Sequence, residues 1–384
     1  MRVCLVYDCL YPYTVGGAER WYRNLAERLA RNGVQVTYLT RRQWARGSQP
    51  RVQGVRVVAR GTAMPLYSRG RRRLLPPIVF GISVLWHMVR HGREYDVVHS
   101  AAFPYFPLLA VALMRRASGY RLVVDWHEVW PDDYWREYLG SALGPVGSLV
   151  QSLCVRAGDR AFCFSRLHAE RLRAAGFRKE IDVLTGEYAG APDGSEPEPA
   201  LPLVLFAGRH TPEKRVLAIP AAVAAARRRV PDLRCEIYGN GPDRPALLRA
   251  IEASRLDGAI IAPGFVPEAE LDHAMRRALC MLLPSRREGY GLVVVEAAAR
   301  GVPSVVVAGE DNAATELVDD GVNGFVAAEG DPARLADAIV RVHEGGMALR
   351  QSTARWFADN ARRLSIDSSV ATVAGEYAAT SRRA

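Results

Sequence analysis

Two cations and two carboxylates follow apolar segments, in turns or at the start of a predicted helix, a combination suited to phosphate and hydroxyl groups. Arg209 and Lys214 flank the turn GRHTPEK (208–214), which follows the apolar segment LVLFA. Two cations at a turn that enters a helix suit a diphosphate, because both neutralise negative charge on a leaving group. Lys214 is one of only two lysines, the other being Lys179, among 51 Lys and Arg residues. This rarity favours a specific use of its compact ammonium over an ordinary solvated charge.

Glu288 and Glu296 lie in the segment PSRREGYGLVVVEAAARG (284–301). Glu288 precedes the glycine-spaced GYG, and Glu296 falls one turn into a predicted helix. Glycines let backbone amides approach a phosphate, and carboxylates accept hydrogen bonds from the vicinal hydroxyls of a sugar or a ribose. The alternatives are a solvated loop charge for Glu288 and a buried carboxylate that needs a partner for Glu296.

Two glycine turns and one histidine are weaker indications of a ligand site. GGAE (16–19) follows the first apolar segment and opens a helix, and GNGP (239–242) follows another such segment. Neither is a G-x-G-x-x-G sequence and no P-loop lysine follows, so an ordinary tight turn explains either one equally well. His127 comes just after RLVVD and could donate a hydrogen bond to a phosphate or a sugar hydroxyl, although a structural histidine is the alternative.

Metal and cofactor chemistry find little support in the sequence. The chain contains no D-x-D sequence, the usual carboxylate pair that holds a divalent ion on a sugar nucleotide. We therefore assign neutralisation of a diphosphate to Arg209 and Lys214. His87 and His91 have an i,i+4 spacing, but no carboxylate joins them, and we reject a metal site there. We expect neither a metal nor a cofactor.

Strand-like apolar segments alternate with helical patterns along the chain. The first half contains VCLVYD, VQVTYLT, VRVVA, DVVHS, YRLVVDW, RAFCFS and IDVLTG, and the second LVLFAG, LRCEIYG, AIIAPGF, CMLLPS, PSVVVA and GFVAA. Such alternation predicts parallel β-α-β sheets, which bind ligands at the carboxyl ends of their strands. The apolar stretch Leu74–Val89 contains two prolines and a histidine, is too short for a membrane span, and predicts a buried helix.

A segment rich in Pro, Gly and acid, GAPDGSEPEPALP (190–202), divides the 384 residues at a change of charge. Residues 1–190 contain 28 Lys and Arg against 15 Asp and Glu, whereas residues 191–384 contain 23 against 26. The length suits two domains. We predict an N-terminal α/β domain at 1–190, a linker at 191–202 and a second α/β domain at 203–366, with a cleft between their strand ends.

Charge and cysteine content bear on partners and compartment. A basic first half suggests an anionic partner, which could be a membrane surface, a phosphorylated acceptor or nucleic acid; drift in an arginine-rich genome explains it equally well. The six cysteines are scattered and form no C-x-x-C pair, which disfavours a disulfide framework and a zinc site. Together with an opening apolar run too short for a signal peptide, they lead us to expect a cytoplasmic protein.

The motifs occur in an order that resembles the family-four retaining glycosyltransferases of GT-B fold. They are GGAE, His127, GRHTPEK, GNGP, GFV (264–266), EGYGLVVVE (288–296) and ELVDDGVNGF (316–325). The resemblance covers nearly the whole chain, and its most specific part is the E-x7-E motif in register with the GR…K turn. One departure is the stretch EDNAAT (310–315), which is more polar than the loop of that family.

This resemblance implies two facing Rossmann-like domains, with the acceptor on the N-terminal one, the nucleotide sugar on residues 203–366, and a helix within 367–384 that crosses back to the first domain. Arg209 and Lys214 would hold the diphosphate, Glu288 the sugar and Glu296 the ribose, and His127 would reach the donor. The implied catalytic residues are Arg209, Lys214, Glu288 and His127, and the implied donor site is Gly16, Gly17, Gly208, Gly241, Gly264, Phe265, Val266, Glu288, Gly289, Tyr290, Gly291, Leu292 and Glu296.

We therefore predict a retaining, metal-independent hexosyltransferase that moves a sugar from a nucleotide sugar, in the first place a UDP-sugar, to a glycan, lipid-linked or small-molecule acceptor. The rival interpretations are a sugar-nucleotide epimerase or phosphorylase of the same fold and, far less favoured, a basic nucleic-acid-binding protein. The basic run RGRRR (69–73) predicts weak contact with anionic membranes through Arg69, Arg71, Arg72 and Arg73, at the inner face of the membrane. Neither it nor DDYWREYLG (132–140) identifies the acceptor.

The missing D-x-D sequence leads to the first prediction. Turnover should survive EDTA, because Arg209 and Lys214 rather than a divalent ion are assigned to the diphosphate. Steady-state rates measured with and without the chelator test this. A loss of turnover that Mg²⁺ or Mn²⁺ restores would show that the diphosphate site is misassigned.

Overall fold

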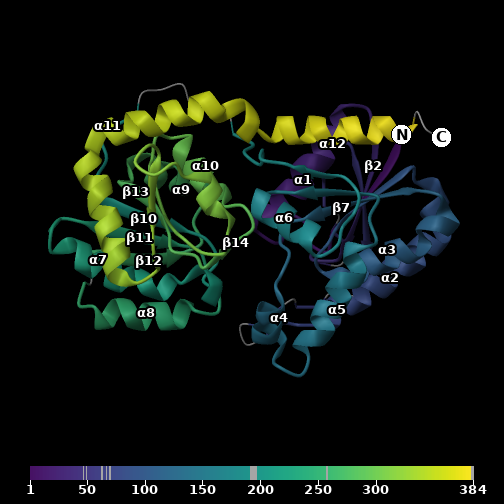
Figure 1. Cartoon of the computed structure of the whole chain (residues 1–384), viewed down its shortest axis with the longest axis horizontal. Helices are drawn as coiled ribbons and strands as arrows, with labels where there is room; N and C mark the ends of the chain where they lie inside the picture. Colours follow the sequence, from purple (N-terminus) through teal and green to yellow (C-terminus); the bar gives the residue numbers. More distant parts are fainter. Residues whose placement is uncertain are drawn as a thin grey trace. The chain divides into compact units, whose positions relative to one another are not determined.

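The computed structural model describes two compact units, each with a parallel sheet between helices (Figure 1). The first unit comprises Met1–Ser68, Arg72–Ala189 and Ser365–Ala384, and the second Arg69–Arg71 and Gly190–Leu364. The two parallel α/β sheets confirm the predicted fold class. The described residues are 1–45, 47–48, 50–61, 64–65, 67–68, 71–190, 197–256 and 258–381.

The first unit is built on a seven-stranded sheet of order β3-β2-β1-β6-β7-β8-β9, in which every neighbouring pair is parallel. Helices cover both faces of such a sheet, so its strands are continuous apolar runs rather than alternating ones. All seven strands expected in this half are present. They are β1 (Arg2–Val6), β2 (Gln35–Arg41), β3 (Val55–Arg60), β6 (Val97–Ala101), β7 (Arg121–Trp126), β8 (Arg160–Cys163) and β9 (Ile181–Val183); β4 (Tyr67–Ser68) and β5 (Arg71–Arg72) are two residues each.

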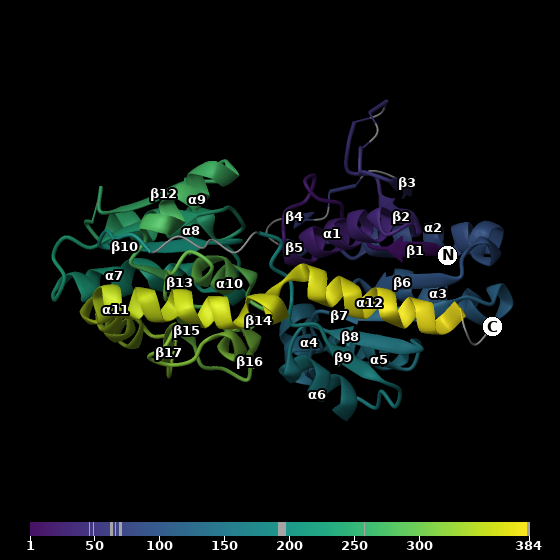
Figure 2. The ribbon, with the colours of Figure 1, turned by 90° about the horizontal axis from the view of Figure 1, so that it is seen from above.

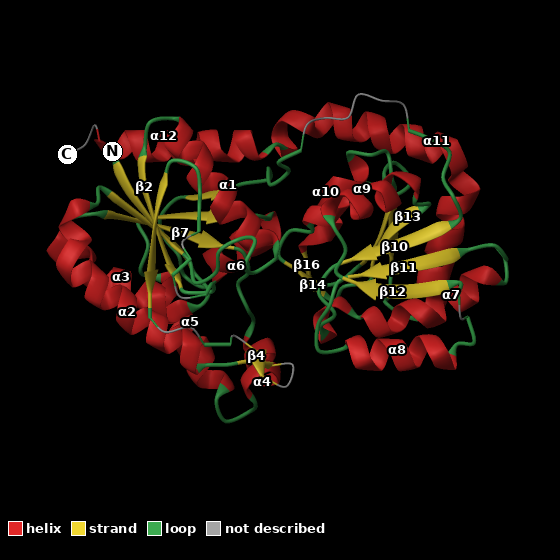
Figure 3. Ribbon diagram, turned by 180° about the vertical axis from the view of Figure 1, so that it is seen from behind, coloured by secondary structure: helices red, strands yellow, loops and turns green. Residues whose placement is uncertain are grey.

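The helices of the first unit form two layers. Helices α2, α3 and α5 run along one side of the sheet, and α1 and α12 along the other (Figure 3). The bounds are α1 (Gly17–Arg31), α2 (Leu75–His91), α3 (Tyr105–Ser118), α4 (Asp132–Leu139), α5 (Gly144–Val155), α6 (Arg166–Ala174) and α12 (Ile366–Ser381), with the 3-10 turn η1 (Gly92–Glu94).

Helix α2 corrects the prediction of a buried helix over residues 74–89. Only one side of it packs on the sheet, where Phe80 and Met88 are buried. On the other side Ile82, Trp86 and Val89 are 53%, 58% and 55% exposed. The prediction was wrong because an apolar composition does not show that a helix lies in an outer layer with a partner on one side only.

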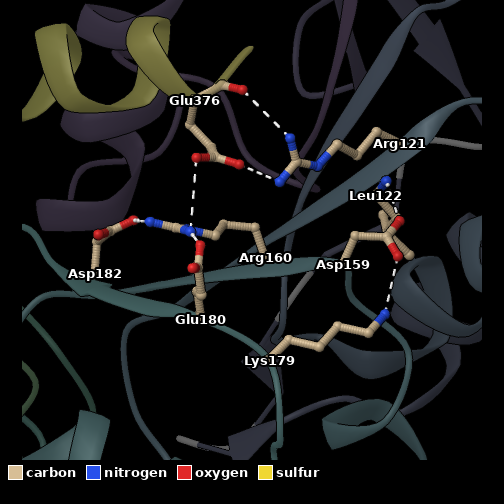
Figure 4. A network of polar contacts seen from close by, with 8 residues as sticks. All are labelled: Arg121, Leu122, Asp159, Arg160, Lys179, Glu180, Asp182 and Glu376. Atoms are coloured by element: carbon tan, nitrogen blue, oxygen red, sulfur yellow. Dashed lines mark hydrogen bonds and ion pairs between the residues drawn. The ribbon is translucent and has the colours of Figure 1, made fainter. Parts of the chain in front are cut away.

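The C-terminal helix α12 packs onto the first unit through buried and half-buried polar contacts. The Tyr377 hydroxyl lies 2.5 Å from Nδ1 of His99, and both side chains are fully buried. The Glu376 carboxylate pairs with Arg121 and lies 3.7 Å from Arg160 (Figure 4). At the start of the helix, Asp367 lies 2.5 Å from Arg28. These contacts attach the last segment of the chain to strands β6, β7 and β8 and to helix α1.

The ion pairs around α12 continue into the loops between β7 and β9 (Figure 4). Arg160 also contacts Glu180 and lies 2.6 Å from Asp182 on β9. Asp159 accepts hydrogen bonds from the Leu122 amide at 3.0 Å and from Lys179 at 2.9 Å. Lys179, the other lysine of the chain, therefore makes a structural contact with the residue that precedes β8.

The second unit has a six-stranded sheet of order β12-β11-β10-β13-β15-β17, again parallel throughout. The six expected strands are β10 (Leu203–Ala207), β11 (Arg234–Tyr238), β12 (Ile260–Gly264), β13 (Cys280–Leu283), β15 (Ser304–Val307) and β17 (Gly324–Ala327). A separate short pair joins β14 (Arg287–Glu288) to β16 (Asp311–Asn312). The helices are α7 (Ile219–Arg227), α8 (Arg244–Ala253), α9 (Glu268–Arg277), α10 (Leu292–Ala298) and α11 (Pro332–Leu364), with the 3-10 turns η2 (Pro212–Lys214), η3 (Val216–Ala218) and η4 (Ala313–Leu317).

Helix α11 runs along the second unit, and helix α12 runs along the first (Figure 2). α11 is kinked at Gly346, whose φ of 49° and ψ of −138° are not helical. Among the described residues, no helix is long and apolar enough to cross a membrane. All six cysteines are buried and free, as expected for apolar filler residues.

The buried contact between Tyr377 and His99 predicts that Tyr377→Phe weakens the attachment of α12. Removing the hydroxyl leaves a buried ring nitrogen without its partner, which costs about 1–3 kcal/mol. Amide hydrogen exchange should therefore accelerate in α12. Thr372→Ala is the control, because Thr372 is exposed on the same helix and bonds only the Ser368 carbonyl, at 3.2 Å. Equal protection in Tyr377→Phe and the parent would contradict the role given to this hydroxyl.

Candidate functional site

The second unit places its two most informative motifs on either side of the point where the strand order reverses. From β10 the chain proceeds outward to β11 and β12, and from β13 it proceeds the other way to β15 and β17. Open parallel sheets bind ligands at the carboxyl ends of the strands next to this switch point. The turn 208–214 follows β10 and the segment 284–288 follows β13, so both lie at that position.

Lys214 and Glu288 make a direct ion pair across the switch point. Lys214 Nζ lies 2.5 Å from Glu288 Oε1, and the side chains are only 19% and 8% exposed. The Arg286 amide donates to the Glu213 carbonyl at 2.8 Å, which ties the two loops together next to the pair. An ammonium has three donors, so Lys214 can keep Glu288 as a partner while it donates to an anionic oxygen. The carboxylate thus orients the cation before any ligand is present.

Arg209 and Glu296 occupy the same two segments but differ in their surroundings. Arg209 is exposed in the turn after β10, five residues before Lys214. Glu296 is half-buried on α10, where its backbone carbonyl accepts a hydrogen bond from Arg300 at 2.6 Å. Both side chains are therefore within reach of solvent at the carboxyl edge of the sheet, unlike the apolar residues around them.

Glycines line the carboxyl ends of β10, β11 and β12. The Gly208 amide donates to the Tyr238 carbonyl at 3.1 Å, and the Gly239 amide donates to the Gly264 carbonyl at 2.8 Å. Gly239 has a φ of 114°, and a Cβ there would lie 1.9 Å from the Gly208 carbonyl oxygen. A Cβ on Gly241 would lie 2.3 Å from the His210 oxygen. The glycines thus let the three strand ends pack closely, where a Cβ would clash with neighbouring backbone.

The turn after β12 carries the residues expected beside a base. Gly264 is buried with a φ of 101°, Val266 is half-buried, and the Phe265 side chain is 66% exposed. Arg244 of α8 donates to the Ala262 carbonyl at 2.7 Å, and its guanidinium lies 3.8 Å from the Cβ position of Gly264. In the sequence, Arg244 stands where GNGP would need a third glycine to form a G-x-G-x-x-G motif.

The GYG turn leads from Glu288 into α10. Gly289 is half-buried and Tyr290 is buried, and α10 begins at Leu292. Gly291 caps the helix with a φ of 104°, and a Cβ there would lie 2.7 Å from Ala314 Cβ. The first amides of a helix have no partner within the helix, so this turn presents donors beside Glu288.

The polar stretch 310–315 supports the site, a role that the sequence did not reveal. Asn312 is buried, and its Nδ2 donates to the carbonyls of Ser285 at 3.0 Å and Val307 at 2.8 Å. Its Oδ1 accepts from the Ala314 amide at 3.1 Å. On the same short strand Asp311 lies 2.9 Å from Arg287, the neighbour of Glu288. The polar residues that depart from the family pattern thus support the segment that carries Glu288. In the sequence, their only indication was a single Asn shortly after the apolar run VVVA and directly before AA.

In the first unit, His127 lies just past the carboxyl end of β7. Its ring stacks on Phe164, with centroids 4.2 Å apart and an angle of 10° between the planes. Tyr22 of α1 contacts it edge-on at 6.3 Å. Among the described residues, His127 Nε2 is buried without a hydrogen-bond partner. Burial disfavours the charged ring and lowers the pKa of His127 to about 4, with Asp125 opposing and His99 adding to the effect. The imidazole is neutral at physiological pH.

Beside His127 lies a buried polar network that sequence reasoning missed. Asp125 accepts hydrogen bonds from His99 Nε2 at 2.6 Å and from Trp21 Nε1 at 2.8 Å. Burial alone would raise the pKa of Asp125, but the charge and hydrogen bond of His99 outweigh it and hold that pKa below its usual value. Single polar residues inside the apolar segments DVVHS and YRLVVDW were the available indication.

The GGAE turn stands at the amino end of α1. Gly16 caps the helix and Gly17 is its first residue. A Cβ on Gly16 would lie 2.4 Å from a carboxylate oxygen of Glu19, and Gly17 lies near the buried Glu187. Gly16 therefore gives the Glu19 carboxylate room at the start of the helix, whereas a Cβ on Gly17 would make only an ordinary contact with Glu187, at 3.9 Å.

Two parallel-sheet units with glycine-lined strand ends define a GT-B class of fold, and solved structures of that class match the whole chain. A sucrose-phosphate synthase from Thermosynechococcus elongatus has a TM-score of 0.81 at 17% identity and is covered 100%, as is this chain. The Anabaena protein Alr3699/HepE in complex with UDP-glucose has a TM-score of 0.72 at 17% identity, with 99% of this chain and 100% of the other covered.

Sequence matches identify the family. Residues 15–186 match Glycosyltransferase Family 4, and residues 201–344 match Glycosyl transferases group 1. The chain therefore belongs to the family-four glycosyltransferases of GT-B fold, as the order of its motifs had predicted.

The individual relatives either have a lower sequence identity over most of the chain or match only about a third of it. An alpha-D-kanosaminyltransferase from Streptomyces kanamyceticus is 33% identical over 37% of this chain and 36% of its own length. A D-inositol 3-phosphate glycosyltransferase from Frankia alni is 34% identical over 36% of each chain. A glycogen synthase from Mycobacterium tuberculosis is 26% identical over 91% of this chain and 88% of its own. The first two matches thus span about a third of those relatives.

The position of His127 predicts its titration. Since burial lowers its pKa to about 4, below an ordinary value near 6.5, the ring should stay neutral down to about pH 5. The unfolded chain binds this proton at higher pH, so the contribution of His127 to stability is present above pH 6.5 and is lost as the pH falls toward 4. Ring-nitrogen NMR of His127, assigned by comparison with His127→Gln, measures the pKa. A value of 6 or above would show that the ring is solvated.

Proposed function

We propose that this protein transfers a sugar with retention from a nucleotide sugar, in the first place a UDP-sugar, without a metal ion. The observation that carries the proposal is the Lys214–Glu288 pair at the switch point of the second unit, 2.5 Å apart and largely buried. A cation fixed there by a carboxylate suits the diphosphate of a donor, and the same carboxylate can accept hydrogen bonds from sugar hydroxyls.

A uridine donor gains support from the structural relatives. The Anabaena protein Alr3699/HepE has been solved with UDP, with UDP and glucose, and with UDP-glucose. We infer that the second unit of this chain takes a nucleotide diphosphate sugar in the same way. Its base would lie by Gly264, Phe265 and Val266, and its ribose hydroxyls by Glu296.

The proposed chemistry is a front-face displacement. The acceptor oxygen bonds to the anomeric carbon on the face from which the diphosphate departs, and an oxygen of the leaving diphosphate takes the acceptor proton. Arg209 and Lys214 stabilise the negative charge that grows on the diphosphate. Glu288 orients the sugar, and the neutral His127 donates a hydrogen bond to the donor. The protein thus contributes positioning and charge stabilisation rather than a nucleophile.

We propose that the first unit takes the acceptor, which is a glycan, a lipid-linked molecule or a small molecule, on the cytoplasmic side of a membrane. The excess of 28 Lys and Arg over 15 Asp and Glu in residues 1–190 supports contact with an anionic membrane. Of the arginines named for this contact, Arg69 lies outside the described residues, as do the side chains of Arg71 and Arg72, and Arg73 is half-buried.

A sugar-nucleotide epimerase or a phosphorylase with the same fold remains the rival activity. Incubation with the donor alone detects an epimerase, and incubation with inorganic phosphate detects a phosphorylase. The donor for these assays comes from a thermal-shift comparison of UDP, GDP, ADP and dTDP. A nucleotide that binds the folded state raises its melting temperature by mass action, and UDP should give the largest shift.

Kinetics of four variants test the mechanism. Arg209→Ala and Lys214→Ala should each depress kcat by about 2–4 kcal/mol in barrier, the range for a lost oxyanion donor, because they act on charge that develops in the transition state. Glu296→Ala should chiefly raise the donor KM, because the ribose does not change during the reaction. Glu288→Ala should fall between the two effects, because the sugar it orients flattens in the transition state.

The matched control is Glu252→Ala, which removes an exposed carboxylate from α8 of the same unit. Its kcat and KM should equal those of the parent. An intact kcat with a raised KM in both cation variants would mean that Arg209 and Lys214 bind only the ground state. An anomeric configuration of the product opposite to that of the donor would exclude retention.

A further inference from the structure

Three helices of the first unit expose apolar side chains on their outer sides. On α2 these side chains recur at i, i+4 and i+7, and on α5 at i, i+3 and i+7, so α2 and α5 each carry one stripe, and α3 between them adds a single residue. They are Ile82 at 53%, Trp86 at 58% and Val89 at 55% on α2, Leu113 at 71% on α3, and Val146 at 53%, Leu149 at 60% and Leu153 at 50% exposed on α5. We name these seven residues the α2–α3–α5 face.

The stripes belong to one surface because the three helices form one layer. Helix α2 packs against α3, and α3 packs against α5. Their inner residues, among them Phe80, Leu108 and Cys154, enter the same core cluster with the sheet. The outer residues therefore point away from the sheet on the same side, where the three helices lie together (Figures 1 and 3). A monomeric protein rarely exposes so many large apolar side chains over neighbouring helices without a use for them.

The charged residues on the three helices themselves are all basic. None of the three helices contains an Asp or a Glu. Arg90, Arg93 and Arg116 are exposed at the carboxyl ends of α2 and α3 or just beyond. The Arg90 guanidinium lies 4.8 Å above the Trp86 ring, a pairing of aromatic ring and cation that suits the boundary between hydrocarbon and water.

Acids on neighbouring segments are in contact with other groups; Asp132 of α4, which is exposed, accepts a hydrogen bond from Ser148 of α5 at 2.5 Å. Glu94, which follows α2, lies 2.8 Å from His91, whose hydrogen bond is the largest cause of the lowered pKa of Glu94. Asp159 lies 2.8 Å from Arg115 and 2.9 Å from Lys179. The exposed arginines are thus not matched by carboxylates on the face itself.

We propose that the α2–α3–α5 face docks on an anionic phospholipid bilayer. Its apolar side chains enter the boundary of the acyl chains, and Arg90, Arg93 and Arg116 contact the anionic headgroups. This deepens the membrane contact in the proposed function and gives it a surface other than residues 69–73. A second copy of the chain fits less well, because self-association would bring arginines against arginines on a face whose helices carry no acid.

The test is co-sedimentation of the full chain with vesicles of phosphatidylcholine, alone or mixed with phosphatidylglycerol. The parent should partition onto the mixed vesicles. An apolar variant should lose at least about tenfold in partition coefficient, and a charge variant about fivefold for each arginine. The apolar variant is Ile82→Ser, Trp86→Ser and Leu149→Ser combined, and the charge variant is Arg90→Gln, Arg93→Gln and Arg116→Gln combined.

Matched controls come from exposed residues of the second unit. Leu248→Ser removes an apolar side chain that is 45% exposed, and the combined change Arg228→Gln, Arg249→Gln and Arg355→Gln removes the same charge as the arginine variant from exposed positions. Both should partition like the parent. Trp86→Phe supplies a second readout, since quenching of tryptophan fluorescence by brominated lipid should fall when Trp86 is absent.

Three results would overturn the proposal. The first is unchanged partitioning of the apolar variant, and the second is an equal loss in the arginine variant and its charge-matched control, which would reflect net charge alone. The third is a dimer of the parent that the apolar variant abolishes, with no binding to vesicles. The thermal shift with UDP should persist in every variant, so failure of membrane docking leaves sugar transfer standing, and loss of the shift in the parent would count against the donor site instead.

Discussion

The candidate site depends on one constraint, that parallel strands present their carboxyl ends at a common edge. In the second unit this edge brings the turn after β10 beside the segment after β13, although about 70 residues of chain separate Lys214 from Glu288. A largely buried ion pair then becomes favourable, because the two loops are already held together by the hydrogen bond between the Arg286 amide and the Glu213 carbonyl. Each charge reduces the cost of burying the other. The glycines at the neighbouring strand ends let these ends pack closely.

The first unit also contains a buried charge, which a network of buried side chains stabilises. Asp125 is fully buried yet ionised, which is tolerable only because Trp21 and His99 donate to both of its oxygens. His99 in turn contacts Tyr377, so the network extends from β7 to the C-terminal helix. His127 lies two residues beyond Asp125, and its stacking on Phe164 gives the ring a fixed orientation. The attachment of α12 and the placement of His127 therefore rest on the same group of side chains.

Hydropathy and turn composition predicted the strands of both units and the alternation of strand and helix, since buried parallel strands are continuous apolar runs. The same evidence misjudged α2, because composition does not distinguish a helix packed on all sides from one in an outer layer. Lys214 and Glu288 were candidates from their positions after strands, but their contact is a tertiary feature. The roles of Asn312 and Asp125 were not predicted for a related reason. The function of a single polar residue in an apolar run depends on hydrogen-bond partners that only the folded structure brings to it. The catalytic roles of Arg209, Lys214, Glu288 and His127 and the ribose contact of Glu296 stay predictions.

The distribution of charge connects these features. Residues 1–190 carry 13 more cations than acids by the counts of 28 and 15, and several of those acids are used internally: Asp125 bonds His99, Asp159 bonds Arg115 and Lys179, and Asp182 bonds Arg160. The acids of this unit are therefore too few to pair with every Lys and Arg. Part of it lies at the carboxyl ends of α2 and α3, next to the exposed apolar stripes. Apolar area and positive charge are each common on protein surfaces. Their occurrence together on helices without acids is the combination that binds an anionic bilayer, through apolar insertion and attraction to the headgroups.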